Sequence, residues 1–314
     1  MLSDFQNYSM CPATQTDWMI YTVVPVYVLI ISVLGIVLNI LVLLVFWIRK
    51  KAWTVPEIYL FNMAAADLLL TSFLPFWAVN VSNKFIWSFG SHLCRIVNVC
   101  IVMNSNCSIY FLVLVSIDRF LALVHPLTRD RVCKRTYAKL SCLLVWCFGF
   151  LLSVPTLMCR KVKHYPEQNA TSCIFNCSEA VYITTESIMT VFGFIIPAVI
   201  ISYCTVKIVH ALQKPLEGVK IKTMEHKATI LVLVVLVAFL VCWVPFHIVR
   251  MIELLLRTEI IPGNDSCEVV RIFDICTHIF VYFAFFNSVL NPIIYITIGR
   301  SVMQSKILEG SYFL

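Results

Sequence analysis

Seven long stretches of this sequence carry almost no charge, and this pattern limits the possible fold more than any other feature. They are residues 18–48, 58–83, 96–117, 140–159, 187–206, 228–249 and 275–299. Each reaches the roughly 20 residues that an α-helix needs to cross the hydrocarbon core of a bilayer. The whole chain is 60% hydrophobic and 13% charged, whereas soluble domains are about 25% charged. We therefore predict an all-α membrane protein, a seven-transmembrane helix bundle.

A membrane β-barrel is the only other structure that satisfies the backbone in lipid. Its strands would alternate polar and apolar residues over about ten positions. The first stretch contains "LIISVLGIVLNILVLLVFWI", which shows no such alternation. The pattern therefore favours helices over a barrel.

Positive charge in the connecting segments predicts the orientation, because Lys and Arg stay on the cytoplasmic side. Of the 24 Lys and Arg, 16 lie in residues 49–57, 118–139, 207–227 and 300–314. We therefore predict one domain, 1–314, with an extracellular N-terminus (1–20), the bundle (21–299) and a short cytoplasmic tail (300–314) that forms one amphipathic helix. The tail has few phosphorylation sites.

The two faces differ in net charge. The outer segments hold 10 of the 17 Asp and Glu but only 8 of the Lys and Arg. An acidic outer face suits a cationic ligand, and a basic inner face suits anionic membrane lipids and cytoplasmic protein partners. We expect no nucleic-acid partner.

Cysteines and glycosylation sequons mark the outer segments. Most of the 14 cysteines lie inside spans, but four lie in outer segments or at a span mouth: Cys11, Cys94, Cys173 and Cys267. In an oxidising compartment these four predict two disulfides, with Cys177 left over. Glycosylation is expected at the outer sequons, Asn7, Asn169, Asn176 and Asn264.

Asp67 is the only charge in residues 58–83 and falls near the middle of the membrane. Such a carboxylate is costly unless it is paired, protonated or bound to an ion, so it is a candidate functional residue. Polar residues of other spans that can surround it are Asn39, Asn104, Ser108, Asn287, Ser288 and Asn291. Their oxygens suit a sodium ion. Hydrogen bonds among these side chains, which would form a polar seam between the helices, explain their presence equally well.

Asp118 and Arg119 stand at the end of the third span. Arg119 follows Cys94 by a helix length of about 37 Å at 1.5 Å per residue, which places it at the cytoplasmic mouth. Glu225, just before the sixth span, can reach Arg119 and latch one conformation of the bundle. The alternative is an interfacial arginine that reaches toward the lipid headgroups.

Several motifs together resemble the rhodopsin-like G-protein-coupled receptors over nearly the whole chain. They are "GIVLN", "NMAAADL" with Asp67, Cys94, "DRF", Trp146, "CWVP" and "NPIIY". The resemblance implies a receptor of the plasma membrane that acts through a heterotrimeric G protein. Thr205 departs from the family pattern, because many members have a tyrosine there that meets the arginine in the active state.

The resemblance also assigns roles to single residues. It implies a sodium site of Asp67, Asn104, Ser108, Asn287 and Asn291, and no other cofactor. The implied switch residues are Trp243, the core trio Ile109, Pro197 and Phe239, the latch of Asp118, Arg119 and Glu225, and Tyr295.

Within that family, "PEIYLFNMAAADL", "LPFWA", "FGSHLCRIVN" and "SIDRFLALV" look most similar to the kinin (bradykinin) receptors. This implies a short cationic peptide ligand, phospholipase-C coupling and a calcium signal; chemokine- and angiotensin-type peptide receptors remain the alternative. The implied ligand-binding residues are Glu253, Asp274, Ile101, Trp77, Trp243 and Phe246. The implied disulfides are Cys94 with Cys173 and Cys11 with Cys267.

Two other classes of membrane protein fit the sequence less well. A transporter would show several ionisable groups at the membrane midplane, whereas Asp67 is nearly alone. An intramembrane enzyme would need paired aspartates, a Gly-X-Ser motif or a His-Glu-X-X-His cluster. The spans contain no paired aspartates and no His-Glu-X-X-His cluster, and the one Gly-X-Ser of the sequence, residues 299–301, lies at the start of the tail. We therefore predict a receptor that is not an enzyme.

Overall fold

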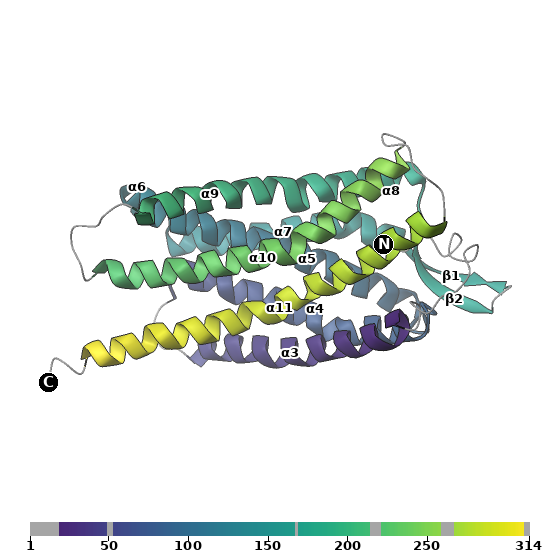
Figure 1. The fold of residues 1–314 in the computed structure, drawn as a ribbon, viewed down its shortest axis with the longest axis horizontal. Helices are drawn as coiled ribbons and strands as arrows, with labels where there is room; N and C mark the ends of the chain where they lie inside the picture. The colour runs from purple at the N-terminus through teal and green to yellow at the C-terminus, as the bar shows by residue number, and fades with distance from the viewer. Residues whose placement is uncertain (1–18, 49–52, 167–168, 214–220, 259–266, 311–314) are drawn as a thin grey trace.

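A computed structural model describes residues 19–48, 53–166, 169–213, 221–258 and 267–310. Most of them are helical (Figure 1). The elements are η1 (Met19–Val23), α3 (Val24–Ile48), α4 (Val55–Ser82), α5 (Gly90–Val124), α6 (Pro126–Val132), α7 (Arg135–Cys159), β1 (Arg160–Tyr165), β2 (Ala170–Phe175), α8 (Glu179–Thr190), η3 (Val191–Ile195), α9 (Ile196–Gln213), α10 (Ile221–Arg257) and α11 (Cys267–Gly310).

Within these residues, seven helical segments are long and apolar enough to cross a membrane. They are Ile20–Ile48, Val55–Ser82, Gly90–Val124, Arg135–Cys159, Glu179–Ala211, Leu236–Leu256 and Ile275–Ile294. The fifth consists of α8, the π-helical turn η3 and α9 in succession. The predicted all-α bundle is thus confirmed.

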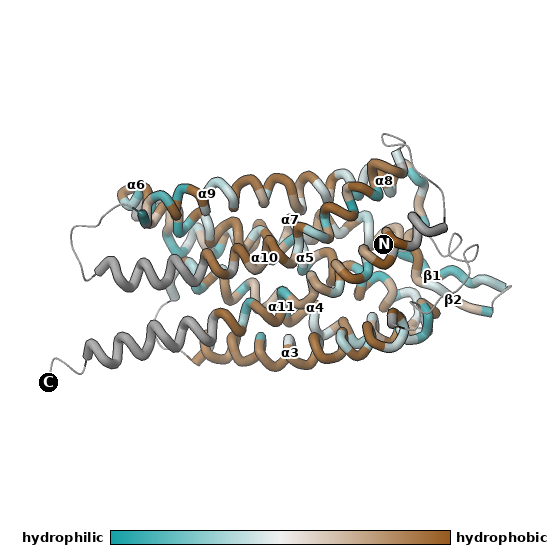
Figure 2. The backbone as a smooth tube through the Cα atoms, in the orientation of Figure 1, coloured by the Kyte–Doolittle hydropathy of each residue, from teal (hydrophilic) through white to brown (hydrophobic). Residues whose placement is uncertain are grey.

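The polarity of the bundle is the reverse of that of a soluble protein. Large apolar side chains such as Val33, Leu144 and Val199 are exposed, while Asn39, Asp67 and Asn104 are buried. Figure 2 shows hydrophobic colour along much of the helix bodies and hydrophilic colour on much of β1. Lipid solvates the apolar exterior, so the polar side chains gather between the helices.

Helix α5 is central, since it packs against α4, α7, α9 and α10. Next to it, α3 and α4 approach closely where Gly35 faces Thr71: a Cβ atom at position 35 would overlap the Thr71 methyl group. The Ser32 hydroxyl donates to the Thr71 carbonyl at 2.7 Å in the same contact. Glycine in the "GIVLN" motif thus permits the close approach of two helices.

A two-stranded antiparallel hairpin, β1 and β2, lies at one end of the bundle (Figure 1). Its register pairs Arg160 with Phe175 and Tyr165 with Ala170. A disulfide joins Cys173 of β2 to Cys94 near the start of α5, as predicted. We call this end of the bundle the hairpin end.

The second disulfide differs from the prediction. Cys177, left over in the sequence analysis, is bonded to Cys159. Cys159 was assigned to the fourth span, but it is the last residue of α7, and the hairpin returns the chain to that point. The other predicted disulfide joins Cys11 and Cys267. Cys11 and the side chain of Cys267 lie outside the described residues.

The predicted C-terminal helix is present but not separate. Helix α11 continues without a break from Cys267 to Gly310, whereas the sequence analysis expected a distinct helix after position 299. Backbone hydrogen bonding along α11 therefore extends the seventh span by several turns.

We predict that the Cys159–Cys177 link stabilises the hairpin against unfolding. Its loop spans 18 residues, for which chain entropy gives about 3 kcal/mol. Replacing both cysteines by serine should lower the melting temperature of the purified protein and speed proteolysis between α7 and α8. Cys147→Ser, at an exposed free cysteine, is the control. Equal melting temperatures for the double variant and the wild type would contradict the prediction.

Candidate functional site

A cavity of about 140 Å³ opens at the hairpin end. Helices α5, α8, α10 and α11 and the hairpin line it with both apolar and charged side chains. Among the lining residues are Ile101, Phe175, Trp243, Phe246 and Phe285. Pockets that enclose drug-sized molecules are larger, about 300–1,000 Å³. The cavity therefore suits one end of a larger ligand.

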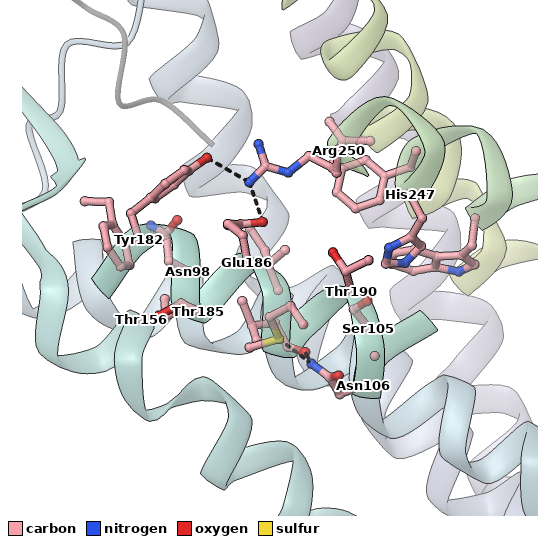
Figure 3. A pocket seen from close by; sticks show the side chains of 18 of the residues that line it. Asn98, Ser105, Asn106, Thr156, Tyr182, Thr185, Glu186, Thr190, His247 and Arg250 are labelled. Carbon is pink, nitrogen blue, oxygen red and sulfur yellow. Dashed lines mark hydrogen bonds and ion pairs between the residues drawn. The ribbon is translucent and has the colours of Figure 1, made fainter. Parts of the chain in front are cut away.

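A charged cluster forms one wall of this cavity (Figure 3). The Arg250 guanidinium of α10 lies 2.6 Å from a carboxylate oxygen of Glu186 in α8 and 2.6 Å from one of Glu253, a turn further along α10. The Tyr182 hydroxyl accepts from Arg250 at 3.2 Å and donates to Glu253 at 3.4 Å. These contacts join the hairpin-end halves of the fifth and sixth spans.

Arg160, the first residue of β1, is the second buried guanidinium of the cavity wall. It donates to the Cys173 carbonyl at 3.4 Å and lies over the Phe175 ring. Burial lowers the pKa of Arg160 to about 10; the charge of Glu186 opposes this shift and that of Arg250 adds to it. Arg160 therefore remains a cation at neutral pH.

Aromatic rings form the floor of the cavity. His247 stacks on Phe194 with ring centroids 4.3 Å apart, and Trp243 stacks on Phe239 at 5.9 Å. Phe246 meets Trp243 edge-on. The floor thus connects the cavity to the core trio, of which Ile109 and Phe239 share one buried cluster and Pro197 is also buried.

A second polar cluster surrounds Asp67 in the middle of the bundle, where the carboxylate is fully buried. Asn104 donates to it at 2.8 Å and Ser108 at 3.4 Å, both from α5. Ser288 donates at 2.9 Å and Asn291 at 3.0 Å, both from α11. Four neutral donors from two helices therefore compensate one buried carboxylate of a third.

The Asp67 cluster also contains buried acceptors without donors among the described residues. They are the side-chain carbonyl oxygens of Asn39, Asn287 and Asn291. Amide and carboxylate oxygens are the ligands that hard cations take. The donor set thus fits a small hard cation, although Asn287 itself donates no hydrogen bond to Asp67 in this part of the structure.

At the far end of the bundle, Arg119 is held by its neighbour. Its guanidinium lies 2.6 Å from the Asp118 carboxylate, which Arg129 approaches at 3.7 Å. The side chains of Glu225 and Tyr295 lie outside the described residues. The Thr205 hydroxyl is buried without a hydrogen-bond partner in the described structure.

Comparison with known proteins decides the family. The profile of the "7 transmembrane receptor (rhodopsin family)" matches residues 38–295. The chain belongs to this family. Similar receptors include the human B2 bradykinin receptor, 41% identical over 93% of this chain and 75% of that receptor. The human B1 bradykinin receptor is 36% identical over 97% of this chain and 86% of that receptor.

The residues expected to contact the ligand lie in different places in this receptor. Ile101, Trp243 and Phe246 line the cavity. Trp77 is only 2% exposed and packs in the apolar cluster that includes Trp87 and Cys94, and it is not among the cavity-lining residues. Glu253 belongs to the charged cluster, and the side chain of Asp274 lies outside the described residues.

Sequence reasoning missed the charged partners of Glu253. Glu186 and Arg250 flank the uncharged stretches 187–206 and 228–249 directly, and hydropathy alone assigns both to the connecting segments. The helices in fact continue past both residues. The sequence did contain a signal for this ion pair: an acid and an arginine stand at the ends of two successive spans, on the same side of the membrane.

We predict that Ser288 stabilises the receptor through Asp67. Ser288→Ala removes one donor from a buried carboxylate, which should lower the free energy of unfolding by about 1–3 kcal/mol. Thermal unfolding of the purified receptor measures this. Ser153→Ala is the matched control, because Ser153 is equally buried but bonds only to the Gly149 carbonyl of its own helix. An equal effect of both changes would refute the prediction.

Proposed function

We propose that this chain is a cell-surface receptor for a short cationic peptide of the kinin class. The observation that carries the proposal is the likeness to the B2 and B1 bradykinin receptors over more than nine-tenths of the chain. The alternative ligands, chemokine- or angiotensin-type peptides, are outcomes of the test below.

The cavity supports a peptide ligand. Its size suits a terminal residue, and its wall includes Glu186, whose partner Arg250 also contacts Glu253. We propose that Glu253 and Asp274 receive the positive N-terminal end of the peptide, in line with the acidic outer segments. Ile101 and Phe246 then supply apolar contact.

We propose that the hairpin end faces the extracellular side of the plasma membrane, with the N-terminus outside. The charge distribution of the connecting segments supports this orientation. It also exposes two sequons, Asn169 between the strands and Asn176 after β2, to glycosylation. The sequons at Asn7 and Asn264 lie outside the described residues.

The opposite end is then the G-protein side. We propose that Arg119 couples to a phospholipase-C-stimulating G protein and that its release from an inactive latch with Glu225 accompanies activation. The Asp118 contact keeps the guanidinium ordered at the mouth of the bundle. Tyr295 and the trio of Ile109, Pro197 and Phe239 would rearrange between the two states. Lipids surround the bundle, and arrestin remains an open partner.

A calcium-release assay tests the proposed function. Cells that express this chain should respond to kinin peptides and not to angiotensin or chemokine peptides. Arg119→Ala should abolish the calcium signal while labelled kinin still binds at the cell surface. A response confined to an angiotensin or chemokine peptide would replace the proposed ligand, and intact signalling by Arg119→Ala would argue against the proposed coupling role.

We also propose that Asp67 binds a sodium ion that favours the inactive state, with Asn104, Ser108, Asn287 and Asn291 around it. A ligand that prefers one state shifts the population toward that state. Sodium should therefore weaken agonist binding to the wild type, and Asp67→Asn should abolish this effect. The test measures agonist affinity of the wild type and of Asp67→Asn in a sodium salt and in the salt of a large organic cation at equal ionic strength. A variant that remains equally sensitive to sodium would place the site elsewhere.

A further inference from the structure

One cation already occupies both Glu186 in the cavity wall and Glu253 beside it. Arg250 is 8% exposed and makes a 2.6 Å contact with Glu186 and another with Glu253. A guanidinium has donors on several nitrogens in a planar fork and can serve two carboxylates at once. The acids are therefore arranged around a guanidinium.

The acids are more accessible than the arginine that they hold. Their side chains are 25% and 22% exposed, against 8% for Arg250. Glu186 lines the cavity together with Arg250 and Tyr182 (Figure 3). A cation that enters the cavity can thus reach Glu186 without first displacing a layer of apolar side chains.

The charges of the cluster favour a cationic visitor over an anionic one. The two groups in ion-pair contact with Arg250 are both carboxylates, those of Glu186 and Glu253. An anion that approached Arg250 would meet both carboxylates at the same short distance from the guanidinium. Like charges at that distance repel strongly in a partly buried site.

We propose that Glu186 and Glu253 form a guanidinium-binding site that the receptor's own Arg250 fills, so that a guanidinium ligand binds by competing with Arg250. The site itself follows from the geometry alone. The competition with a peptide rests on the proposed function. Arg250 is then a specificity-determining residue that limits affinity for the ligand's cationic end.

Chemical rescue tests the site without any peptide. Arg250→Ala keeps the Cβ atom and removes the guanidinium, so ethylguanidinium supplies the missing atoms. We expect this ion to raise the melting temperature of purified Arg250→Ala receptor saturably, while neutral ethylurea does not. The wild type, whose site is filled, should show no saturable shift.

Two control variants make the rescue specific. Arg95→Ala also removes a guanidinium, one that donates to the Arg160 carbonyl at 3.1 Å, and ethylguanidinium should not rescue it. Adding Glu186→Gln to Arg250→Ala should abolish the rescue. If ethylguanidinium stabilises none of the variants, or stabilises Arg95→Ala equally, the site is refuted. Arg250→Ser, which also leaves the space of the guanidinium open, replaces Arg250→Ala should the latter not fold.

Peptide binding tests the competition. Arg250→Gln should increase affinity for a kinin peptide with an N-terminal arginine on the order of tenfold, and much less for the same peptide with citrulline there. Equal changes for the two peptides, or weaker binding of the arginine peptide alone, would overturn the competition. Should no kinin peptide bind the wild type, the proposed ligand fails while the rescue experiment still decides the site.

Discussion

The buried Asp67 carboxylate is the interaction around which the bundle is arranged. A carboxylate away from water needs hydrogen bonds or a counter-ion, and here α5 and α11 supply four donors to a residue of α4. Asn39 of α3 adds a bond to the Ser288 carbonyl at 2.9 Å. The consecutive helices α3, α4 and α5 and the distant helix α11 are thus joined by one polar centre. Lipid gives them no hydrophobic reason to associate, so such contacts carry much of their specificity.

The cluster at the hairpin end meets the same requirement in a different way. Asp67 is satisfied by neutral donors and is fully buried, whereas Glu186 and Glu253 are satisfied by a cation and remain partly exposed. Neutral donors hydrogen-bond the Asp67 carboxyl group without supplying a counter-charge, in line with the sodium ion proposed above. The guanidinium of Arg250 contacts both carboxylates of its pair, so a further cation reaches them only in competition with Arg250.

The sequence predicted the helices and the Asp67 cluster well because both follow from simple regularities. Uncharged length predicts a span, and i to i+4 spacing places Asn104 and Ser108 on one face of α5. The choice between Asn287 and Ser288 was harder: both are polar and adjacent, and only the rotation of α11 about its axis decides which one donates to Asp67. The Cys159–Cys177 bond and the Glu186–Arg250 contact depend on where helices end, which hydropathy defines poorly.

An internal arginine gives the cavity a form of selectivity that two free acids would lack. Unpaired carboxylates at an accessible surface attract any cation, but here each visitor must offer the acids more than Arg250 does. A ligand gains only the difference between its contacts and those that it replaces. A compact ammonium group cannot match the planar contact of a guanidinium with two carboxylates. Small cations and peptides that end in lysine therefore gain little binding free energy at this site. A peptide with a guanidinium end and further apolar contacts at Ile101 and Phe246 gains most.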